Sequence, residues 1–232
     1  MTKWLASVQS LDEAQALEFC LPDILDMKNP AQGALGALSA EEVKTVVEWV
    51  DDRCLTSATV GDLPMTATVI APALNLMAAT GVDYVKVGLF ADPALVLCIE
   101  ALNQTLKALK KPVIAVIFAD HEINSAVLPA IKQAGFAGVM VDTAIKNGLR
   151  LTDHWSRAQL KHFVDHARGQ EMFCGLAGAL SIDDIERLRP LNPDYLGFRS
   201  ALCDNRQRTQ ALQVSLAREI AQQMQYGISL AS

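Results

Sequence analysis

Short apolar runs alternate with longer amphipathic segments along the whole chain. The apolar runs are continuous, which is typical of strands that are covered on both faces, as in parallel sheets. We expect strands at residues 4–8, 24–28, 55–60, 84–90, 112–119, 138–142, 172–176 and 195–199. Helical patterns follow them at residues 12–20, 39–50, 64–80, 93–109, 124–134, 153–169, 181–188 and 208–225.

Eight strand–helix units in 232 residues predict a (βα)8 barrel built from one domain, residues 1–232. The alternative is a doubly wound open sheet. Such a sheet usually carries a Gly-x-Gly-x-x-Gly turn after its first strand, and this sequence has no such turn. Ser39 and Glu42 have the spacing of a capping box, and Ser181 is expected to cap the helix at 181–188.

Composition excludes several classes of protein. The formal net charge is −6, whereas nucleic-acid binders are usually basic. Apolar runs stay shorter than the roughly 20 residues of a membrane span. The five cysteines are widely spaced without a Cys-x-x-Cys pair, so we expect neither a disulfide framework nor a zinc site. A reducing, cytoplasmic location fits this pattern best.

Ionisable residues gather where the predicted strands end. Active sites of (βα)8 barrels lie at the carboxyl ends of the strands. Asp26 and Lys28 share one face of the second strand because side chains alternate along a strand. Ionisable residues of the fourth, sixth and eighth strands add to this pair: Lys86, Asp142, the nearby Lys146 and Arg199. The excess of cations at one end of an acidic chain predicts an anionic ligand.

A cluster of lysines in an apolar mouth is suited to imine chemistry. A neutral amine attacks a carbonyl group, and the protonated imine withdraws electrons from the adjacent carbon. Burial and neighbouring cations lower the pKa of a lysine toward that neutral form. Asp26 and Asp142 would then move protons or hold the lysines in place. Alternatively, Asp26–Lys28 and Asp142–Lys146 are only buried ion pairs.

The last two strands predict a phosphate site. Strand seven ends in Gly175-Leu-Ala-Gly178, and Arg199 and Ser200 follow strand eight. Loops at these positions are the usual phosphate site of such barrels, because backbone N–H groups and a helix N-terminus face the ligand. We therefore expect Gly175, Gly178, Arg199 and Ser200 to bind a substrate phosphate.

Five motifs together resemble the (5-formylfuran-3-yl)methyl phosphate synthases of methanofuran biosynthesis. They are Asp26-Met-Lys28-Asn-Pro30, the Gly33–Gly36 loop, Ser57-Ala-Thr-Val-Gly-Asp62, Tyr84-Val-Lys-Val-Gly-Leu89 and Asp142-Thr-Ala-Ile-Lys146. The resemblance covers nearly the whole chain. It implies a barrel related to class I aldolases that condenses two molecules of glyceraldehyde 3-phosphate into a furan aldehyde phosphate. Release of phosphate and water makes this a lyase-type reaction, with no metal or organic cofactor.

The same resemblance implies roles for single residues. Lys28 falls on the Schiff-base lysine and Lys146 on a second essential lysine, although spacing alone leaves their division of labour open. Asp26, Lys86 and Asp142 fall on the supporting groups. Ser200 stands where a glycine usually follows the arginine of strand eight.

Two other functions fit part of the pattern. Another class I aldolase acting on a sugar phosphate would share the lysines and the phosphate site. A non-catalytic sugar-phosphate sensor would keep Arg199 and the glycines but would not need Lys28 beside Asp26. The helix at 64–80 is apolar nearly all round, which predicts a homo-oligomer.

Overall fold

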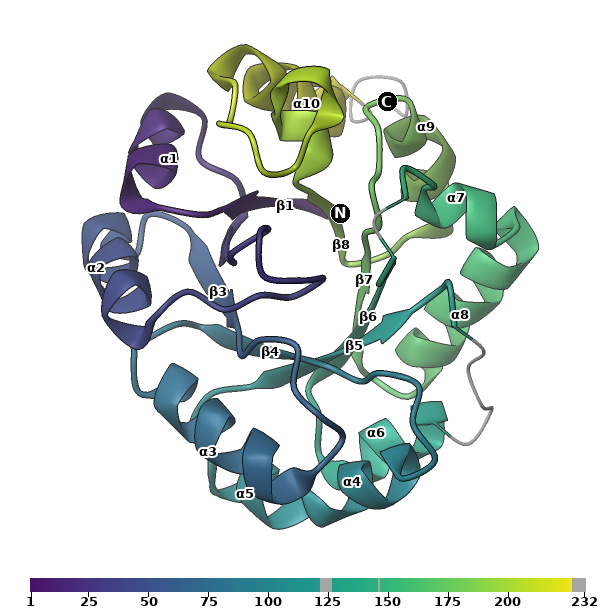
Figure 1. Ribbon diagram of the computed structural model, residues 1–232. Helices are drawn as coiled ribbons and strands as arrows, with labels where there is room; N and C mark the ends of the chain where they lie inside the picture. Colours follow the sequence, from purple (N-terminus) through teal and green to yellow (C-terminus); the bar gives the residue numbers. More distant parts are fainter. Residues whose placement is uncertain (122–126, 146, 227–232) are drawn as a thin grey trace.

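The computed structural model describes residues 1–121, 127–145 and 147–226. Eight parallel strands form a closed barrel in which each strand pairs with its neighbours in sequence and the last pairs with the first (Figure 1). The strands are β1 (Lys3–Val8), β2 (Ile24–Met27), β3 (Leu55–Thr59), β4 (Tyr84–Gly88), β5 (Val113–Phe118), β6 (Gly138–Asp142), β7 (Phe173–Leu176) and β8 (Tyr195–Phe198). The predicted (βα)8 barrel is confirmed, and the doubly wound sheet is excluded.

Helices surround the barrel on its outside (Figure 1). The described residues form α1 (Leu11–Ala16), α2 (Ala40–Val50), α3 (Ala67–Ala78), α4 (Leu95–Ala101), α5 (Asn103–Ala108), α6 (Val127–Ala134), α7 (Leu151–His154), α8 (Arg157–Gly169), α9 (Asp184–Leu188) and α10 (Val214–Tyr226). The capping box predicted for α2 is present, because the Ser39 hydroxyl accepts from the Glu42 amide and the Glu42 carboxylate accepts from the Ser39 amide. Within the described residues, no helix has the length and hydropathy needed to span a membrane.

Three predicted helices are interrupted or capped differently. The segment 93–109 forms α4 and α5, which meet at Leu102. The segment 153–169 is broken before α8, because Ser156 starts a new capping box with Gln159. Ser181 does not cap its helix: α9 begins at Asp184, and the Ser181 hydroxyl donates to the Asp184 carboxylate at 2.9 Å.

The last predicted helix begins later than expected, and this difference matters for the site. Helix α10 starts at Val214 rather than at Arg208. Residues 203–213, which we call the β8 strap, line the mouth of the barrel and are irregular apart from one 3-10 turn, Asp204–Arg206. Cys203 and Leu212 form an isolated antiparallel bridge, and the Gln213 amide donates to the Leu202 carbonyl at 2.8 Å. These bonds close the β8 strap into a loop that ends where α10 begins.

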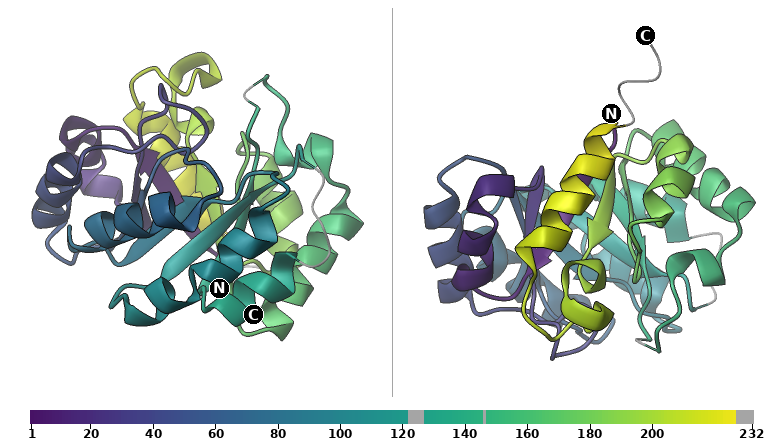
Figure 2. Two further views of the ribbon diagram at one scale, coloured as in Figure 1. Left: turned by 60° about the horizontal axis from the view of Figure 1, so that its bottom comes forward. Right: turned by 90° about the horizontal axis from the view of Figure 1, so that it is seen from above.

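The barrel wall separates two apolar cores. The larger one lies between the strands and the helices. The smaller one fills the lumen with alternate strand residues, together with Ala34 and Leu35 from the loop after β2. That loop lies across the middle of the barrel in the view along its axis (Figure 1). Seen from the side, the loops that follow the strands lie at one end, and the N-terminus lies at the other (Figure 2).

Candidate active site

An ion pair between Asp26 and Lys86 lies inside the barrel. The Lys86 ammonium is 2.7 Å from Asp26 Oδ1, and the two side chains are 2% and 0% exposed. The hydroxyls of Ser7 and Ser57 also donate to Asp26, at 2.9 and 2.6 Å. Asp26 therefore accepts hydrogen bonds from side chains of three other strands, β1, β3 and β4. Its closest cation is Lys86, which the spacing along β2 did not indicate.

The charge of Asp26 is stabilised despite complete burial. Burial by itself raises the pKa of this carboxyl group, but the charges of Lys86 and Lys28 lower it. Hydrogen bonds from Lys86 and Ser57 act in the same direction, so the pKa of Asp26 lies below its ordinary value. Asp26 is consequently an anion across the neutral range and holds positive charge beside it.

Lys28 and Asp142 face a cavity of about 570 Å³ at the mouth of the barrel. Lys28 directly follows β2 and Asp142 ends β6, and these two strands lie on opposite sides of the eight-stranded barrel. Lys28 is 7% exposed and Asp142 is 3% exposed. The Thr143 amide donates to Asp142 Oδ1 at 2.7 Å and so orients the carboxylate. The structure thus brings two of the predicted catalytic residues to one cavity, whereas Lys146 lies outside the described residues.

Asp62 holds the loop that follows Lys28, and sequence reasoning assigned it no role. Its two carboxylate oxygens accept the amides of Ala34 and Leu35, each at 2.8 Å. Gly33 has φ +102°, and a Cβ there would lie 2.0 Å from Asp62 Oδ2. Only glycine fits this backbone and this close approach. The loop is thereby fixed over the lumen, with Leu35 buried at its tip.

Arg199 is engaged by protein groups on every guanidinium nitrogen. Nη1 and Nη2 donate to the Glu13 carboxylate, at 2.5 and 3.2 Å. Nη1 also donates to the Ser7 carbonyl, Nε to the Arg208 carbonyl and Nη2 to the Gln210 carbonyl. Although Arg199 lines the cavity, this buried ion pair joins β8, α1 and the β8 strap. Its predicted phosphate contact stays a prediction, and Glu13 is a partner that the sequence did not indicate.

The predicted phosphate residues of β7 and β8 have different surroundings. Gly178 and Ser200 line the cavity, and the Ser200 hydroxyl is buried without a hydrogen-bond partner among the described residues. Gly175 does not reach the cavity, since a Cβ there would lie 2.3 Å from the ring of Tyr195 inside the barrel. The ring gives a packing reason for glycine at position 175, and the predicted phosphate contact of Gly175 stays a prediction.

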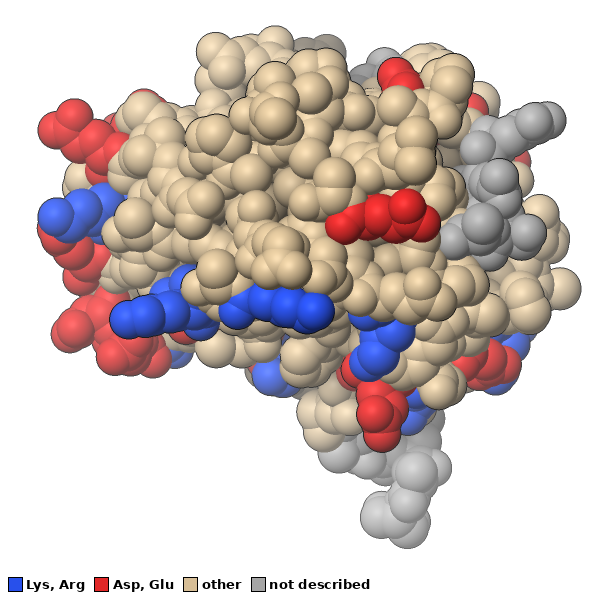
Figure 3. All heavy atoms as spheres, turned by 90° about the horizontal axis from the view of Figure 1, so that it is seen from below, with Lys and Arg blue, Asp and Glu red and all other residues tan. Residues whose placement is uncertain are grey.

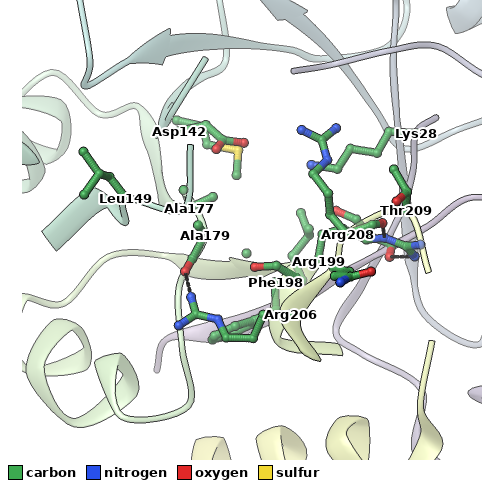
Figure 4. Close-up of a pocket in the computed structure, with 18 of the residues that line it drawn as sticks. Lys28, Asp142, Leu149, Ala177, Ala179, Phe198, Arg199, Arg206, Arg208 and Thr209 are labelled. Atoms are coloured by element: carbon green, nitrogen blue, oxygen red, sulfur yellow. Dashed lines mark hydrogen bonds between the residues drawn. The ribbon is translucent and has the colours of Figure 1, made fainter. Parts of the chain in front are cut away.

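Two arginines of the β8 strap also line the cavity, and sequence reasoning assigned neither to the site (Figure 4). Arg206 donates to the Ala179 carbonyl in the loop after β7. Arg208 donates through Nη2 to the Gly33 carbonyl at 2.6 Å, in the loop after β2. The strap is thus attached to both neighbouring loops. Because the chain is irregular here, its hydrophobic pattern carries no signal for this arrangement.

Asp120, just after β5, supports the loop after β6. Its carboxylate accepts the amides of Ala144 and Ile145 at 2.9 and 2.6 Å. Burial raises the pKa of Asp120, but these backbone bonds outweigh burial and leave the pKa below its ordinary value. The neighbouring His121 contacts the Phe118 ring edge-on, with ring centroids 6.2 Å apart. Asp120 thus fixes the chain just before residue 146.

Replacing Gly178 by alanine is expected to reshape the cavity as well as strain the backbone. Gly178 has φ +110°, and its Cβ would lie 3.1 to 3.2 Å from Thr143 and Leu151. We expect a loss of about 1–3 kcal/mol in the free energy of unfolding, and a raised KM for the substrate that binds in this cavity. Gly135→Ala is the matched control, since Gly135 has φ +100° but its Cβ would meet nothing closer than 3.9 Å. Equal stability and equal KM in the two variants, measured by urea denaturation and kinetics, would contradict the crowding at Gly178.

The fold and its site together define a class: a (βα)8 barrel whose mouth combines buried lysine and carboxylate side chains with arginines. The family model described as 4-HFC-P synthase matches residues 4–221. The chain therefore belongs to the 4-HFC-P synthase family.

Individual relatives support this assignment. The (5-formylfuran-3-yl)methyl phosphate synthase of Methanocaldococcus jannaschii is 35% identical over 209 residues, covering 86% of this chain and 89% of the relative. That of Methanococcus maripaludis strain C7 is 34% identical over 209 residues, covering 85% and 89%. A protein of Methylorubrum extorquens that provisionally carries the same name is 39% identical over 224 residues, covering 96% and 92%.

Solved structures of low sequence identity share the fold. 3-Hexulose-6-phosphate synthase has a TM-score of 0.67 at 17% identity, covering 95% of this chain and 99% of that chain. KGPDC from Streptococcus mutans has a TM-score of 0.67 at 11% identity, covering 97% and 98%. Phosphoribosyl anthranilate isomerase from Thermus thermophilus has a TM-score of 0.66 at 12% identity, covering 95% and 98%.

Proposed function

We propose that this protein is a (5-formylfuran-3-yl)methyl phosphate synthase of methanofuran biosynthesis. It condenses two molecules of glyceraldehyde 3-phosphate into a furan aldehyde phosphate and releases phosphate and water. The observation that carries the proposal is the placement of Lys28 and Asp142 on opposite sides of one cavity, next to the Asp26–Lys86 pair. Membership of the 4-HFC-P synthase family supports the choice of product.

The chemistry begins when one glyceraldehyde 3-phosphate isomerises to its ketone, as a proton leaves C2 and another is added to C1. The neutral amine of Lys28 then attacks the ketone carbon, and the carbinolamine loses water to form an imine. The resulting protonated imine draws electrons from the adjacent C–H bond, so loss of that proton gives an enamine. Lys28 suits this role because it is nearly buried yet faces the cavity.

The enamine carbon then attacks the aldehyde of the second triose phosphate, and the aldehyde oxygen takes up a proton. Elimination of one phosphate, ring closure and loss of water lead to the aromatic furan, and hydrolysis frees Lys28. Asp142 is the carboxylate at the cavity wall and is our candidate for moving these protons. Lys146 is retained as a second essential lysine, as the family resemblance implies.

Asp26 and Lys86 act from beneath the reacting groups. Asp26 carries a negative charge that attracts the positive charge of the Lys28 imine, and Lys86 holds this carboxylate in place. The backbone at Gly178 and the hydroxyl of Ser200 bind a substrate phosphate between the loops after β7 and β8. The buried Ser200 hydroxyl, unpartnered among described residues, supports this assignment.

Incubation with glyceraldehyde 3-phosphate tests the proposed function directly. We expect furan absorbance and free phosphate to appear together in equal amounts. A condensation product without a furan ring would indicate another sugar-phosphate aldolase. Binding of the substrate with neither signal would indicate a sensor.

We also propose that two copies of the chain associate through the face formed by α3 and α4. Figure 3 views this side of the molecule and shows a broad area free of charged side chains. Its apolar residues are exposed, with Leu76 60%, Leu97 69% and Val69 42% accessible. Because each chain has a net charge of −6, an uncharged face allows two copies to approach with least repulsion.

Replacing Leu76 by glutamate is expected to weaken this association by at least about tenfold, because it buries a charge in an apolar contact. Light scattering over a range of concentrations measures the effect. Phe19→Glu is the matched control, since Phe19 is 86% exposed but belongs to another part of the surface. A monomeric wild-type protein, or equal effects of both changes, would contradict self-association through this face.

A further inference from the structure

Arg208 has a buried N–H group that the protein leaves unused. Among the described residues, Arg208 Nε has no hydrogen-bond partner, and the atom itself is shielded from solvent. A buried donor of a charged group is costly when it has no partner. Arg208 lines the cavity, so a ligand in the cavity can supply the missing acceptor. The unused donor therefore points to an anionic ligand.

The other end of the same guanidinium is attached to the loop after β2. Arg208 Nη2 donates to the Gly33 carbonyl at 2.6 Å. Asp62 fixes the next two residues of that loop through their amides. The loop begins directly after Lys28, so one guanidinium group both lines the cavity and contacts the loop that follows Lys28.

Arg206 offers an internal comparison. It belongs to the same β8 strap, but its side chain extends toward Ala179, away from Lys28, whereas Arg208 extends toward the Lys28 side (Figure 4). Burial and the charge of Arg199 lower the pKa of Arg208, whereas the negative charges of Asp142 and Asp62 raise it. Arg208 is thus the strap arginine on the Lys28 side of the cavity (Figure 4).

We propose that Arg208 binds the phosphate of one triose phosphate through Nε and, by holding Gly33 at the same time, positions the loop beside Lys28. This inference rests on the proposed function. Two phosphate dianions in one cavity repel each other, so the second requires a cationic site apart from Gly178 and Ser200. A guanidinium group matches phosphate because its N–H groups form a planar fork. Arg208 is therefore a substrate ligand and a positioning residue.

A substrate that lacks a phosphate group leaves Arg208 Nε without its proposed ligand. Binding energy from a non-reacting phosphate can then be supplied separately, as inorganic phosphate, to promote the reaction at the carbonyl group. With dihydroxyacetone and cyanoborohydride, we expect inorganic phosphate to accelerate labelling of Lys28 in the wild-type protein by about tenfold. In Arg208→Gln the acceleration should be lost. Arg208→Lys keeps the charge but not the fork, so it should recover less than half of the acceleration.

Arg157→Gln is the charge-matched control, because Arg157 is an exposed residue of α8 that donates to the Arg187 carbonyl. It should retain the full acceleration by phosphate. Equal acceleration in Arg208→Gln and in the wild-type protein would overturn the proposal, and so would no acceleration in the wild type. Thermal unfolding confirms that each variant is folded.

Calorimetric titration with inorganic phosphate decides the proposal even if no imine forms. We expect Arg208→Gln to lose one phosphate site, or to bind there at least about tenfold more weakly than the wild type. Unchanged stoichiometry and affinity would overturn the role of Arg208. Failure of furan formation from glyceraldehyde 3-phosphate, with this phosphate site intact, would instead overturn the proposed function.

Discussion

Replacing Lys28 by alanine is expected to lower furan formation by at least about 10⁴-fold, because the covalent intermediate can no longer form. The cavity and the Asp26–Lys86 pair remain, so the variant should still bind triose phosphate. Turnover of glyceraldehyde 3-phosphate, followed by furan absorbance, measures kcat. The effect should fall on kcat far more than on substrate affinity.

Lys28→Arg is the matched control for charge. Its guanidinium stays protonated at neutral pH and cannot attack a carbonyl group, yet it keeps a cation near Asp26. We expect Lys28→Arg to be as inactive as Lys28→Ala but closer to the wild type in stability. More than about 1% residual activity in Lys28→Ala would contradict a covalent role for Lys28.

Replacing Asp26 by asparagine is expected to destabilise the barrel by about 3–5 kcal/mol, because Lys86 would remain buried without its counter-ion. Lys86 is 2% exposed, so solvent cannot replace the lost carboxylate. Urea denaturation measures the free energy of unfolding. Activity should fall as well, since Asp26 also lowers the energy of positive charge near Lys28.

The double variant Asp26→Asn/Lys86→Met separates stability from chemistry. Removing both charges relieves the uncompensated burial, so we expect the double variant to regain most of the stability that Asp26→Asn loses. Activity should not return. A double variant as unstable as the single one would show that the ion pair is not the source of the effect.

The pH dependence of stability provides an independent check on Asp26. Its pKa is lower in the folded protein than in the unfolded chain, so its contribution is fully present above the unfolded value of about 4. The contribution is lost as the pH falls through the lower, folded pKa. The stability difference between wild type and Asp26→Asn should therefore be constant near neutrality and shrink only below about pH 4. A difference that already shrinks between pH 7 and 5 would contradict the lowered pKa.

Continuous apolar runs were sufficient to predict the barrel, because all eight strands are buried on both faces. The pairing of Asp26 was not predictable in the same way. Periodicity along β2 brings Asp26 and Lys28 to one face, but the Lys86 ammonium comes from β4. Which residues of different strands meet in the lumen depends on the register of the closed barrel, which no single strand contains.

The arginines at the mouth of the barrel also make contacts that the local sequence does not predict. Its position at the end of a strand favours Arg199 as the phosphate ligand. In the structure, however, the Arg199 guanidinium forms a buried ion pair with Glu13 of α1. The sequence pattern predicts a helix from Arg208, whereas α10 begins at Val214. The bridge between Cys203 and Leu212 instead keeps this segment irregular and directs Arg208 into the mouth. Such long-range contacts leave no local signature.

Peptide mapping after borohydride reduction, with the wild-type protein and triose phosphate substrate, tests the central claim most directly. We predict one reduced adduct with the mass of a triose phosphate, on the peptide that contains Lys28. An adduct confined to Lys146 would reverse the roles of the two lysines. The absence of any adduct under conditions in which the furan forms would contradict imine catalysis.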